Sequence, residues 1–542
     1  MIVARAVGQT LAELGVDHVF GVVGSGNFHV TNALIDAGAR FVAARHEGGA
    51  ATMADAYARM SGTVAVLTVH QGPGLTNAVT GIAEAAKSRT PLVVLAADVT
   101  ETKSNFYVDQ DALATSVGAV AMRVESADQA VAAAARAYFR ARDDRRTVVL
   151  NLPLAVQAAE AAADPLPTRP RPPDPSPDER GLALLVEVLV HARRPVFIAG
   201  RGSRGARDAL VELGDACVAL LATSAVAKGL FRDNPWSLDV SGGFATPLAA
   251  ELIRGADLIV GWGCALNMWT TRHGKLIGPD ATLVQVDLEP AALGVHREIR
   301  FGVVGDVKAT ARAATEAVGE RAGRGYRSED VRASIEARGR WRDVAYDDTS
   351  TAEHIDPRTL TIALDDMLPA DRVVSVDSGN FMGYPSMFLS VPDERGFCFT
   401  QAYQSIGLGL ATAIGAALAQ PKRLPVAALG DGGALMSIAE LDTVRRLGLP
   451  MVVIVYNDDA YGAEVHHFGP DGHDLSTVRF PSTDIAAIAR GFGFDAVTVR
   501  RLADLAPVRA WLDGPRATPL LVDAKVTAER GSWWVEEAFR GH

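Results

Sequence analysis

The sequence predicts an α/β protein built from three doubly wound parallel-sheet domains. Short apolar runs alternate with Ala-rich helical patterns along most of the chain, which is the βαβα rhythm of parallel sheets covered by helices. Two segments of different composition interrupt this rhythm and divide it into three blocks. The length of 542 residues fits three domains at roughly 100 to 200 residues each.

The first block, residues 1–163, contains four apolar runs that read as buried strands. They are HVFGVV, VAVLTV, PLVVLAA and TVVLNLP. The chain opens with Val3, Val7, Leu11 and Leu14 at helical spacing, with a charged residue among them, so this stretch predicts a helix and not a signal peptide. The Pro-rich segment 164–180 follows, and its prolines predict an extended linker.

The second block, residues 181–323, repeats the rhythm with PVFIAG, CVALLA, DLIVGWG and TLVQVD. It contains Gly200-x-Gly202-x-x-Gly205, which has the form of a dinucleotide fingerprint. The next strand offers no Asp or Glu at its end for a ribose hydroxyl. We therefore interpret the glycines as a tight crossing from strand to helix and do not favour an NAD-dependent dehydrogenase.

The charged segment 324–352 predicts a second linker, and the third block covers residues 353–530. Its strands are expected in RVVSVDSG, PVAALGDGG, PMVVIVYND and PLLVDAKV. Residues 531–542 form a tail in which two tryptophans could close a lid over a site or pack on a neighbour, and the sequence does not decide between these.

The composition of the chain argues against several classes of binding partner. The 53 Lys plus Arg and 64 Asp plus Glu give a net charge of −11, which would repel a nucleic acid backbone. The three cysteines are far apart and suggest neither a disulfide framework nor a zinc site. No apolar run approaches the roughly 18 residues of a membrane span. We expect a cytoplasmic enzyme that binds neither nucleic acid nor membrane.

A metal and phosphate signal lies in the third block. Gly430-Asp431-Gly432-Gly433 ends one expected strand, and Asn457 ends the next, after a helix expected near residues 438–447. Neighbouring parallel strands end at the same edge of a sheet, so Asp431 and Asn457 should converge. A carboxylate, an amide oxygen and phosphate oxygens suit Mg²⁺, and the glycines would let a ligand approach the backbone closely.

The same residues carry a family resemblance. Gly-Asp-Gly followed by this Asn resembles the signature of thiamine-diphosphate (ThDP) enzymes. RHEGGAATMADAYARMSG at 45–62, GPGLTNAVTGIAEA at 72–85 and YQSIGLGLATAIGAALA before the Gly-Asp-Gly are similar to motifs of the acetolactate synthase, pyruvate oxidase and benzoylformate decarboxylase family. The resemblance implies pyrimidine-binding, central and diphosphate-binding domains in that order, and a homodimer or homotetramer.

The resemblance also implies roles for residues that bind the cofactor. Glu47 matches the glutamate that hydrogen-bonds the aminopyrimidine ring and promotes formation of the reactive ylid, and Ile406 matches the apolar residue that holds the cofactor bent. Asp431, Asn457 and the backbone carbonyl of Asp459 match the metal ligands. The remaining residues expected at the cofactor are Asn77, Gly379, Asn380, Gln404, Gly430, Gly432 and Gly433.

Four residues are expected at the reacting end. His70 stands where benzoylformate decarboxylase has a histidine that could move a proton, and Gln71 follows it. Gln110 resembles the active-site glutamine of acetolactate synthases. Glu464 lies seven residues after Asn457, as a glutamate does in pyruvate and indolepyruvate decarboxylases. The alternatives are a hydrogen-bonded His at a strand end, a polar loop Gln and a surface Glu.

A further group of residues is expected near substrate. Ser25, Asn27 and His29 lie where relatives meet substrate groups, although any of them could instead cap the following helix. His466 and His467 are close in sequence to Glu464. Because these positions differ from those of acetolactate synthases, substrate choice is left open.

These expectations give one favoured reaction and one alternative. The favoured reaction is decarboxylation of a 2-oxo acid with transfer of the acyl unit to a second carbonyl, as in acetolactate synthase. The alternative is decarboxylation that releases an aldehyde. FAD, which some family members hold in the central domain, is not favoured. A non-catalytic regulatory relative is disfavoured because Glu47 is retained.

Overall fold

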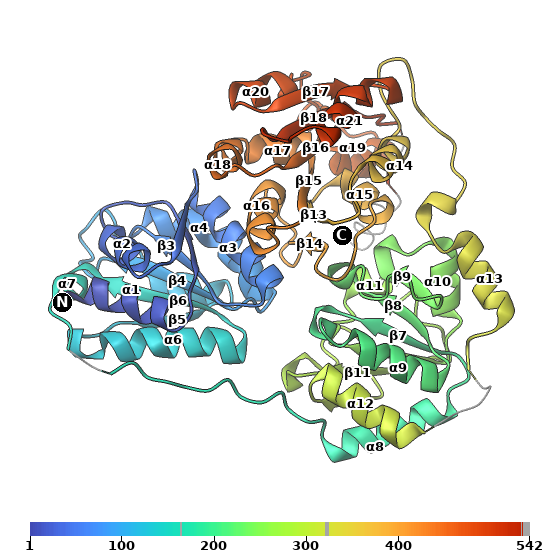
Figure 1. The fold of residues 1–542 in the computed structure, drawn as a ribbon, viewed down its shortest axis with the longest axis horizontal. Helices are drawn as coiled ribbons and strands as arrows, with labels where there is room; N and C mark the ends of the chain where they lie inside the picture. Colours follow the sequence, from blue (N-terminus) through green and yellow to red (C-terminus); the bar gives the residue numbers. More distant parts are fainter. Residues whose placement is uncertain (163–164, 320–324, 530, 533, 535–542) are drawn as a thin grey trace.

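The computed structural model describes residues 1–162, 165–319, 325–529, 531–532 and 534. Three six-stranded sheets lie at the corners of a triangle, one each for the N-terminal, central and C-terminal parts of the chain (Figure 1). Every strand pairing within the sheets is parallel, and helices flank each sheet, so the predicted fold class is confirmed.

The N-terminal sheet has the order β2-β1-β3-β4-β6-β5. Its strands are β1 (His18–Gly21), β2 (Arg40–Ala43), β3 (Ala65–Val69), β4 (Leu92–Asp98), β5 (Val120–Arg123) and β6 (Thr147–Pro153). Its helices are α1 (Val3–Glu13), α2 (Phe28–Asp36), α3 (Glu47–Ser61), α4 (Pro73–Lys87), α5 (Gln110–Ser116), α6 (Ala130–Asp144) and α7 (Leu154–Ala158). Strands β3, β4 and β6 are buried along their whole length, as expected for a sheet covered on both faces.

The central sheet has the order β12-β11-β10-β7-β8-β9. Its strands are β7 (Pro195–Ala199), β8 (Leu220–Thr223), β9 (Ser237–Val240), β10 (Leu258–Trp262), β11 (Thr282–Asp287) and β12 (Phe301–Val304). Its helices are α8 (Glu179–His191), α9 (Arg207–Cys217), α10 (Pro247–Arg254), α11 (Met268–Thr271) and α12 (Val307–Val318). The strand order reverses between β7 and β10, where ligands of such sheets commonly bind.

The C-terminal sheet has the order β14-β13-β15-β16-β18-β17. Its strands are β13 (Arg372–Val376), β14 (Phe397–Phe399), β15 (Leu424–Gly430), β16 (Val452–Asn457), β17 (Asp495–Val499) and β18 (Leu520–Lys525). Its helices are α14 (Pro357–Met367), α15 (Gly383–Phe388), α16 (Gly409–Ala419), α17 (Asp431–Met436), α18 (Glu440–Leu447), α19 (Gly462–Phe468), α20 (Ile485–Gly491) and α21 (Ala506–Asp513).

The two joining segments differ in structure. Residues 165–177 contain no helix or strand and run between the N-terminal and central sheets along one edge of the molecule (Figure 1). The charged segment includes α13 (Glu329–Arg338), whose Ser328 side chain caps the helix by accepting from the amide of Val331. Val331 and Ile335 pack against the apolar core of the central domain. This part of the second joint is therefore folded onto the central domain.

The N-terminal and C-terminal domains share one apolar core, formed where α3 lies between α4 and α16. Small residues allow this close approach. A Cβ on Gly415 of α16 would lie 2.2 Å from the carbonyl oxygen of Met53, and one on Gly81 of α4 would lie 2.6 Å from the Cβ of Ala51. The Ala-rich and Gly-rich patterns of these helices are thus required by packing between helices.

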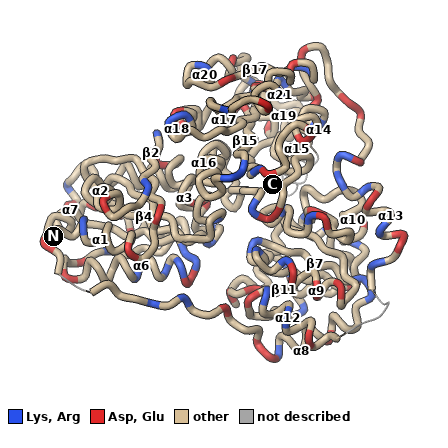
Figure 2. Tube along the Cα trace, viewed as in Figure 1, with Lys and Arg blue, Asp and Glu red and all other residues tan. Residues whose placement is uncertain are grey.

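Lys and Arg residues alternate with Asp and Glu residues along the backbone trace of all three domains (Figure 2). Among the residues that the structure describes, no helix has the length and apolar character that would let it span a bilayer.

The glycine motif of the central domain forms an internal crossing. A Cβ on Gly200 would lie 2.2 Å from the carbonyl oxygen of Gly263, and one on Gly202 would lie 2.8 Å from the Cα of the same residue. The amide of Gly202 donates to the Gly263 carbonyl at 3.1 Å. These two glycines therefore let the loops after β7 and β10 pack backbone against backbone, which agrees with a tight crossing.

This packing predicts that Gly202→Ala lowers the unfolding temperature. The added methyl group would meet backbone atoms that cannot move away cheaply, at a cost of about 1 to 3 kcal/mol. Gly205→Asn is the matched control, because Gly205 has φ +78 and open space around it, and Asn tolerates this conformation at about 1 kcal/mol or less. Calorimetric unfolding of the full chain measures both. Equal stability of Gly202→Ala and the natural protein would contradict the packing argument.

Candidate active site

A cavity of about 1660 Å³ is lined by residues of all three domains. It reaches from the carboxyl ends of the C-terminal strands to the carboxyl ends of the central strands, where Ser224, Cys264 and Asp287 lie. The residues predicted from the sequence that line it are Gly379, Asn380, Gln404, Ile406, Gly430, Asp431, Gly432, Gly433 and Glu464. The structure therefore brings the diphosphate side of the predicted site together.

The candidate metal ligands lie together because their strands are neighbours. Strands β15 and β16 pair with Gly430 opposite Tyr456, so Asp431 and Asn457 emerge side by side. Asp431, Asn457 and Asp459 line a second cavity of about 290 Å³. The Asn457 amide nitrogen donates to Asp523 at 2.9 Å, and this bond turns its oxygen away from Asp523. Two short helices, α17 and α18, join these strands where one helix was expected.

The electrostatics of this corner fit a bound cation. Burial raises the pKa of Asp431 to about 6, and the nearby Asp459 carboxylate adds to the effect. Burial and the Asp431 carboxylate raise the pKa of Asp458 to about 8. Carboxyl groups crowded in a buried place resist ionisation unless positive charge lies close. Oxygen donors of this kind are the ligands that Mg²⁺ prefers.

Two glycines of the Gly-Asp-Gly-Gly turn are also needed for packing within the protein. A Cβ on Gly432 would lie 2.6 Å from the ring of Tyr461, and one on Gly433 would lie 2.2 Å from the Asp377 carboxylate. In the structure, the missing side chains make room for these two residues of the protein itself. Close approach of a ligand is not needed to explain them.

The segment 400–408 carries Gln404 and Ile406 between β14 and α16. Gln404 has φ +62 and Gly407 has φ +84, so the chain turns sharply here. The buried carboxylate of Asp377 accepts from the amides of Gly407 and Leu408 at 3.0 and 3.2 Å. The Ile406 side chain is 37% exposed at this turn, an unusual place for a large apolar group.

The pyrimidine side of the predicted site lies elsewhere. Glu47 is the first residue of α3, and the Asn77 amide donates to its carboxylate at 3.1 Å. Within the part of the chain that the structure describes, Glu47, Asn77, His70 and Gln71 line neither of the two cavities above. One chain therefore presents the two sides of the site separately.

His70 and Gln71 follow β3. The amide of Gly26 donates to Nδ1 of His70 at 3.2 Å, and the ring meets Phe106 edge to face with centroids 5.5 Å apart. Burial lowers the pKa of His70, although Glu47 opposes this. Gln71 is buried, and its Oε1 has no hydrogen-bond partner among the described residues. His70 is half-buried, so its ring is the more accessible of the two side chains to a ligand on this face.

Gln110 and Asn27 instead make internal hydrogen bonds. Gln110 is 2% exposed, accepts from the amide of Gly72 and donates to the Ala97 carbonyl and to Asn151. Asn27 is fully buried and bonds the Gly24 amide, the Val22 carbonyl and Thr68. Both side chains hold their own domain together, which agrees with a structural role and does not place them at substrate.

The remaining substrate candidates differ in exposure. Ser25 and His29 are exposed, and Asn27, the residue that precedes α2, makes no side-chain cap. On α19, Glu464 lines the large cavity. His466 is half-buried, and burial lowers its pKa. The ring of His467 meets that of Phe468 edge to face, with centroids 4.6 Å apart.

The C-terminal tail contacts a predicted cofactor residue. Ser532 Oγ and Trp534 Nε1 each donate to the backbone carbonyl of Asn380 at 2.9 Å. Trp534 is buried beside Phe244 of the central domain and Phe388 of the C-terminal domain. The other tryptophan of the tail, Trp533, lies outside the described residues.

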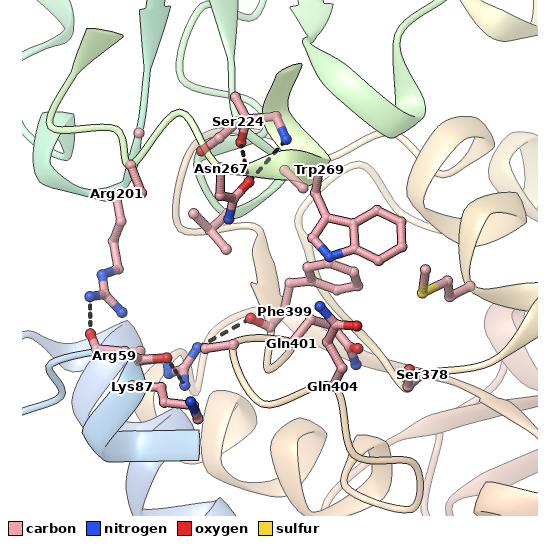
Figure 3. A pocket seen from close by; sticks show the side chains of 18 of the residues that line it. Arg59, Lys87, Arg201, Ser224, Asn267, Trp269, Ser378, Phe399, Gln401 and Gln404 are labelled. Carbon is pink, nitrogen blue, oxygen red and sulfur yellow. Dashed lines mark hydrogen bonds between the residues drawn. The ribbon is translucent and has the colours of Figure 1, made fainter. Parts of the chain in front are cut away.

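Sequence reasoning missed a buried ion cluster next to the cavity. Arg59 forms ion pairs with Asp55 and Glu84 at 2.6 and 2.7 Å, and it donates to the Phe399 carbonyl at 3.2 Å. Figure 3 shows the hydrogen bond from Arg59 to Phe399. Arg201 extends from the central domain toward Arg59 and donates to the backbone carbonyl of Ser88. Only the i, i+4 spacing of Asp55 and Arg59 hinted at it.

Three family models match the chain in the order of its sheets. Residues 1–122 match "Thiamine pyrophosphate enzyme, N-terminal TPP binding domain", residues 182–314 match the central domain, and residues 377–524 match the C-terminal TPP binding domain. Together they cover most strands of the three sheets, and β6 and β13 lie outside the matched ranges. The chain belongs to the thiamine pyrophosphate enzyme family.

Curated relatives of this thiamine pyrophosphate enzyme span nearly its whole length. A probable 2-ketoarginine decarboxylase of Pseudomonas aeruginosa is 32% identical over 84% of this chain and 82% of its own. A sulfoacetaldehyde acetyltransferase of Castellaniella defragrans is 28% identical, over 94% of this chain and 90% of its own. An acetolactate synthase large subunit of Parasynechococcus marenigrum is 28% identical, over 96% and 87%. The prediction of a ThDP-dependent enzyme is confirmed.

The environment of His70 predicts a pH dependence. Because burial lowers its pKa below the ordinary 6.5, the unfolded chain binds this proton more tightly than the folded enzyme does. Stability should therefore fall as the pH drops below 6.5 and level off once the pH is below the folded-state pKa of His70. His70→Gln should reduce this loss. NMR titration, with the signal assigned by its absence in the variant, should give a midpoint below 6.5, and a midpoint at or above 6.5 would contradict the prediction.

Proposed function

We propose that the protein uses thiamine diphosphate and Mg²⁺ to decarboxylate a small 2-oxo acid and to transfer the acyl unit to a second carbonyl compound. The observation that carries this proposal is the large cavity, which begins at the diphosphate side near Asp431 and Glu464 and extends to the central domain. Its volume exceeds the several hundred Å³ of an ordinary small-ligand pocket, which leaves room for an acceptor. The acyltransferases and acetolactate synthases among the relatives support the same reaction.

The diphosphate side would hold the cofactor through its metal. Asp431, the side-chain oxygen of Asn457 and the backbone carbonyl of Asp459 would bind Mg²⁺, because they share one small cavity and form a set of hard oxygen donors. Ile406 would support the cofactor rings from its exposed turn. The residues that would line the rest of the bound cofactor are Gly379, Asn380, Gln404, Gly430, Gly432 and Gly433.

When bound, thiamine diphosphate supplies a carbon nucleophile and an electron sink. The Glu47 carboxylate would accept and return a proton at the pyrimidine ring, and Asn77 would hold that carboxylate in place. His70 is largely neutral at pH 7 because its pKa is lowered, so it can accept a proton from a substrate group. Gln71 and Glu464 would contact substrate from opposite sides of the completed site.

Two copies of the chain would complete each site. The pyrimidine side and the diphosphate side lie apart within one chain, and exposed apolar groups surround both of them. Phe28 and Phe106 are exposed near the first, and Tyr403, Ile406 and Met436 near the second. Large exposed apolar groups indicate a surface that becomes covered. We therefore propose a homodimer or homotetramer in which Glu47 of one copy faces Asp431 of another.

Aldehyde release is the second candidate. Glu464 lines the cavity and could deliver a proton in place of an acceptor carbonyl, and one relative is a probable 2-ketoarginine decarboxylase. The internal hydrogen bonds of Gln110 give no separate support to transfer over aldehyde release.

Bound FAD stays disfavoured in this proposal. The motif that would suggest a dinucleotide has two of its glycines packed against the Gly263 loop, so it offers no separate evidence for a nucleotide. We expect the purified protein to be colourless. The cytoplasmic location expected from the sequence stays a prediction.

The reaction is tested by its products. The enzyme with ThDP and Mg²⁺ is incubated with pyruvate and with larger 2-oxo acids, in the presence and absence of an acceptor aldehyde, and products are identified by mass spectrometry. We expect CO₂ and a hydroxyketone or acetohydroxy acid. Aldehyde as the sole product under excess acceptor would favour the second candidate. The absence of CO₂ from every 2-oxo acid would contradict both candidates.

The shared site is tested by mixing inactive subunits. Glu47→Gln and Asp431→Ala should each remove nearly all activity, because each damages every site of its own dimer. A mixed dimer would contain one doubly damaged site and one intact site. Co-refolded equal amounts should therefore recover about a quarter of natural activity, since half of the dimers are mixed. A mixture of Asp431→Ala with Asn457→Ala is the control and should recover none. No recovery in the first mixture would show that the sites are not shared.

A further inference from the structure

The segment 400–408 has an unusual position, because residues of two domains hold its two ends. It carries Gln404 and the exposed Ile406, and two of its residues have positive φ. Asp377, from the same domain, holds its second end through the amides of Gly407 and Leu408. Its first end is held from the N-terminal domain.

Glu84 of α4 makes that first attachment. Its Oε1 accepts from the amide of Ala402 at 3.0 Å, and its Oε2 accepts from the amide of Tyr403 at 2.6 Å. Two consecutive backbone amides bound by one carboxylate fix both the position and the direction of the chain. Ile406 follows three residues later, so its place depends on where these amides are held.

The Glu84 side chain is fully buried and is held from behind. The Arg59 guanidinium lies 2.7 Å from its Oε1, and the same Arg59 donates to the Phe399 carbonyl at 3.2 Å. Burial opposes ionisation of Glu84, but Arg59 and the two amides outweigh it and lower the pKa. The carboxylate is therefore charged, and hydrogen bonds to charged acceptors are short and strong.

Asp55 belongs to the same cluster, but among the described residues it makes no hydrogen bond or ion pair with the segment. It accepts from Arg59 Nε at 2.8 Å and from Thr90 at 2.6 Å. Loss of its charge would weaken the cluster and leave the bonds from Glu84 to Ala402 and Tyr403 in place. Asp55 thus separates the contribution of the cluster to stability from its contribution to the position of the segment.

We propose that Glu84 is a positioning residue of the active site. It holds segment 400–408 in place, and this positions Ile406 to support the cofactor. Glu84 acts on the diphosphate side of its own chain, although it belongs to the pyrimidine-binding domain. This inference rests on the proposed function in one respect, the role of Ile406 at thiamine diphosphate. Its structural part, the fixing of the segment by Glu84, does not need the cofactor.

The test compares Glu84→Gln with Asp55→Asn in the full-length protein. The glutamine keeps one acceptor oxygen. Its NH₂ group is a donor and would face a backbone amide or Arg59, which are donors too, so one of the hydrogen bonds is lost. Hydrogen exchange of the peptide covering 400–408, followed without cofactor by mass spectrometry, should become faster in Glu84→Gln and stay unchanged in Asp55→Asn. ThDP with Mg²⁺ should bind Glu84→Gln about 10- to 100-fold more weakly by calorimetry, as expected for losing charge-assisted hydrogen bonds.

The outcomes separate the two proposals. Equal losses of stability in both variants, with faster exchange and weaker ThDP binding only in Glu84→Gln, support positioning. Equal effects of both variants on exchange and on binding would reduce Glu84 to a structural residue. If the natural protein does not bind ThDP, the proposed function is wrong. The hydrogen-exchange comparison would still test whether Glu84 positions the segment. If Glu84→Gln fails to fold, Glu84→Asp, which keeps the charge beside Arg59 but is shorter, replaces it in the same comparison.

Discussion

The buried Arg59 side chain is the point on which the arrangement of the three domains depends. It is paired with Asp55 and Glu84 inside the N-terminal domain and donates to Phe399 of the C-terminal domain. Its own backbone carbonyl accepts from Arg204 of the central domain at 2.6 Å. Removing one partner from such a buried cluster leaves an uncompensated charge, at a cost of about 3 to 5 kcal/mol. The shape of the large cavity follows from this junction, because residues around it form the cavity wall.

The two sides of the site are positioned by different means. On the diphosphate side, neighbouring parallel strands bring Asp431 and Asn457 together, so the proposed metal corner is a direct result of sheet topology. On the pyrimidine side, Glu47 begins a helix and is oriented by one hydrogen bond from Asn77. The corner formed by Asp431 and Asn457 is preorganised by the fold of one domain. In the proposed dimer, the pyrimidine side completes a site only when another copy of the chain lies opposite it.

Much of the fold and part of the site could be predicted from the sequence, for identifiable reasons. The apolar runs that predict strands, and the spacing from Asp431 to Asn457, are local signals. Because neighbouring strands of a parallel sheet end at the same edge, these signals also predict which residues lie together. The environment of Gln110 was not predictable, because its partners Gly72, Ala97 and Asn151 come from separate elements. The same holds for Glu84, whose neighbours lie more than 300 residues away in the C-terminal domain. A resemblance transfers the identity of a residue but not the hydrogen bonds that it makes.

The central domain is attached to its two neighbours by hydrogen bonds whose acceptors are backbone carbonyls, and this affects which mutations the protein tolerates. Arg201 and Arg204 donate to the carbonyls of Ser88 and Arg59, and Lys228 and Arg232 donate to those of Ser386 and Val391. All four acceptors are backbone atoms, which every amino acid provides. Mutations of the side chains at Ser88, Ser386 and Val391 would therefore leave these hydrogen bonds in place, whereas Arg59 is also needed for the contacts of its own side chain. The surrounding domains are free to diverge in sequence, and so in substrate, without losing their shared architecture.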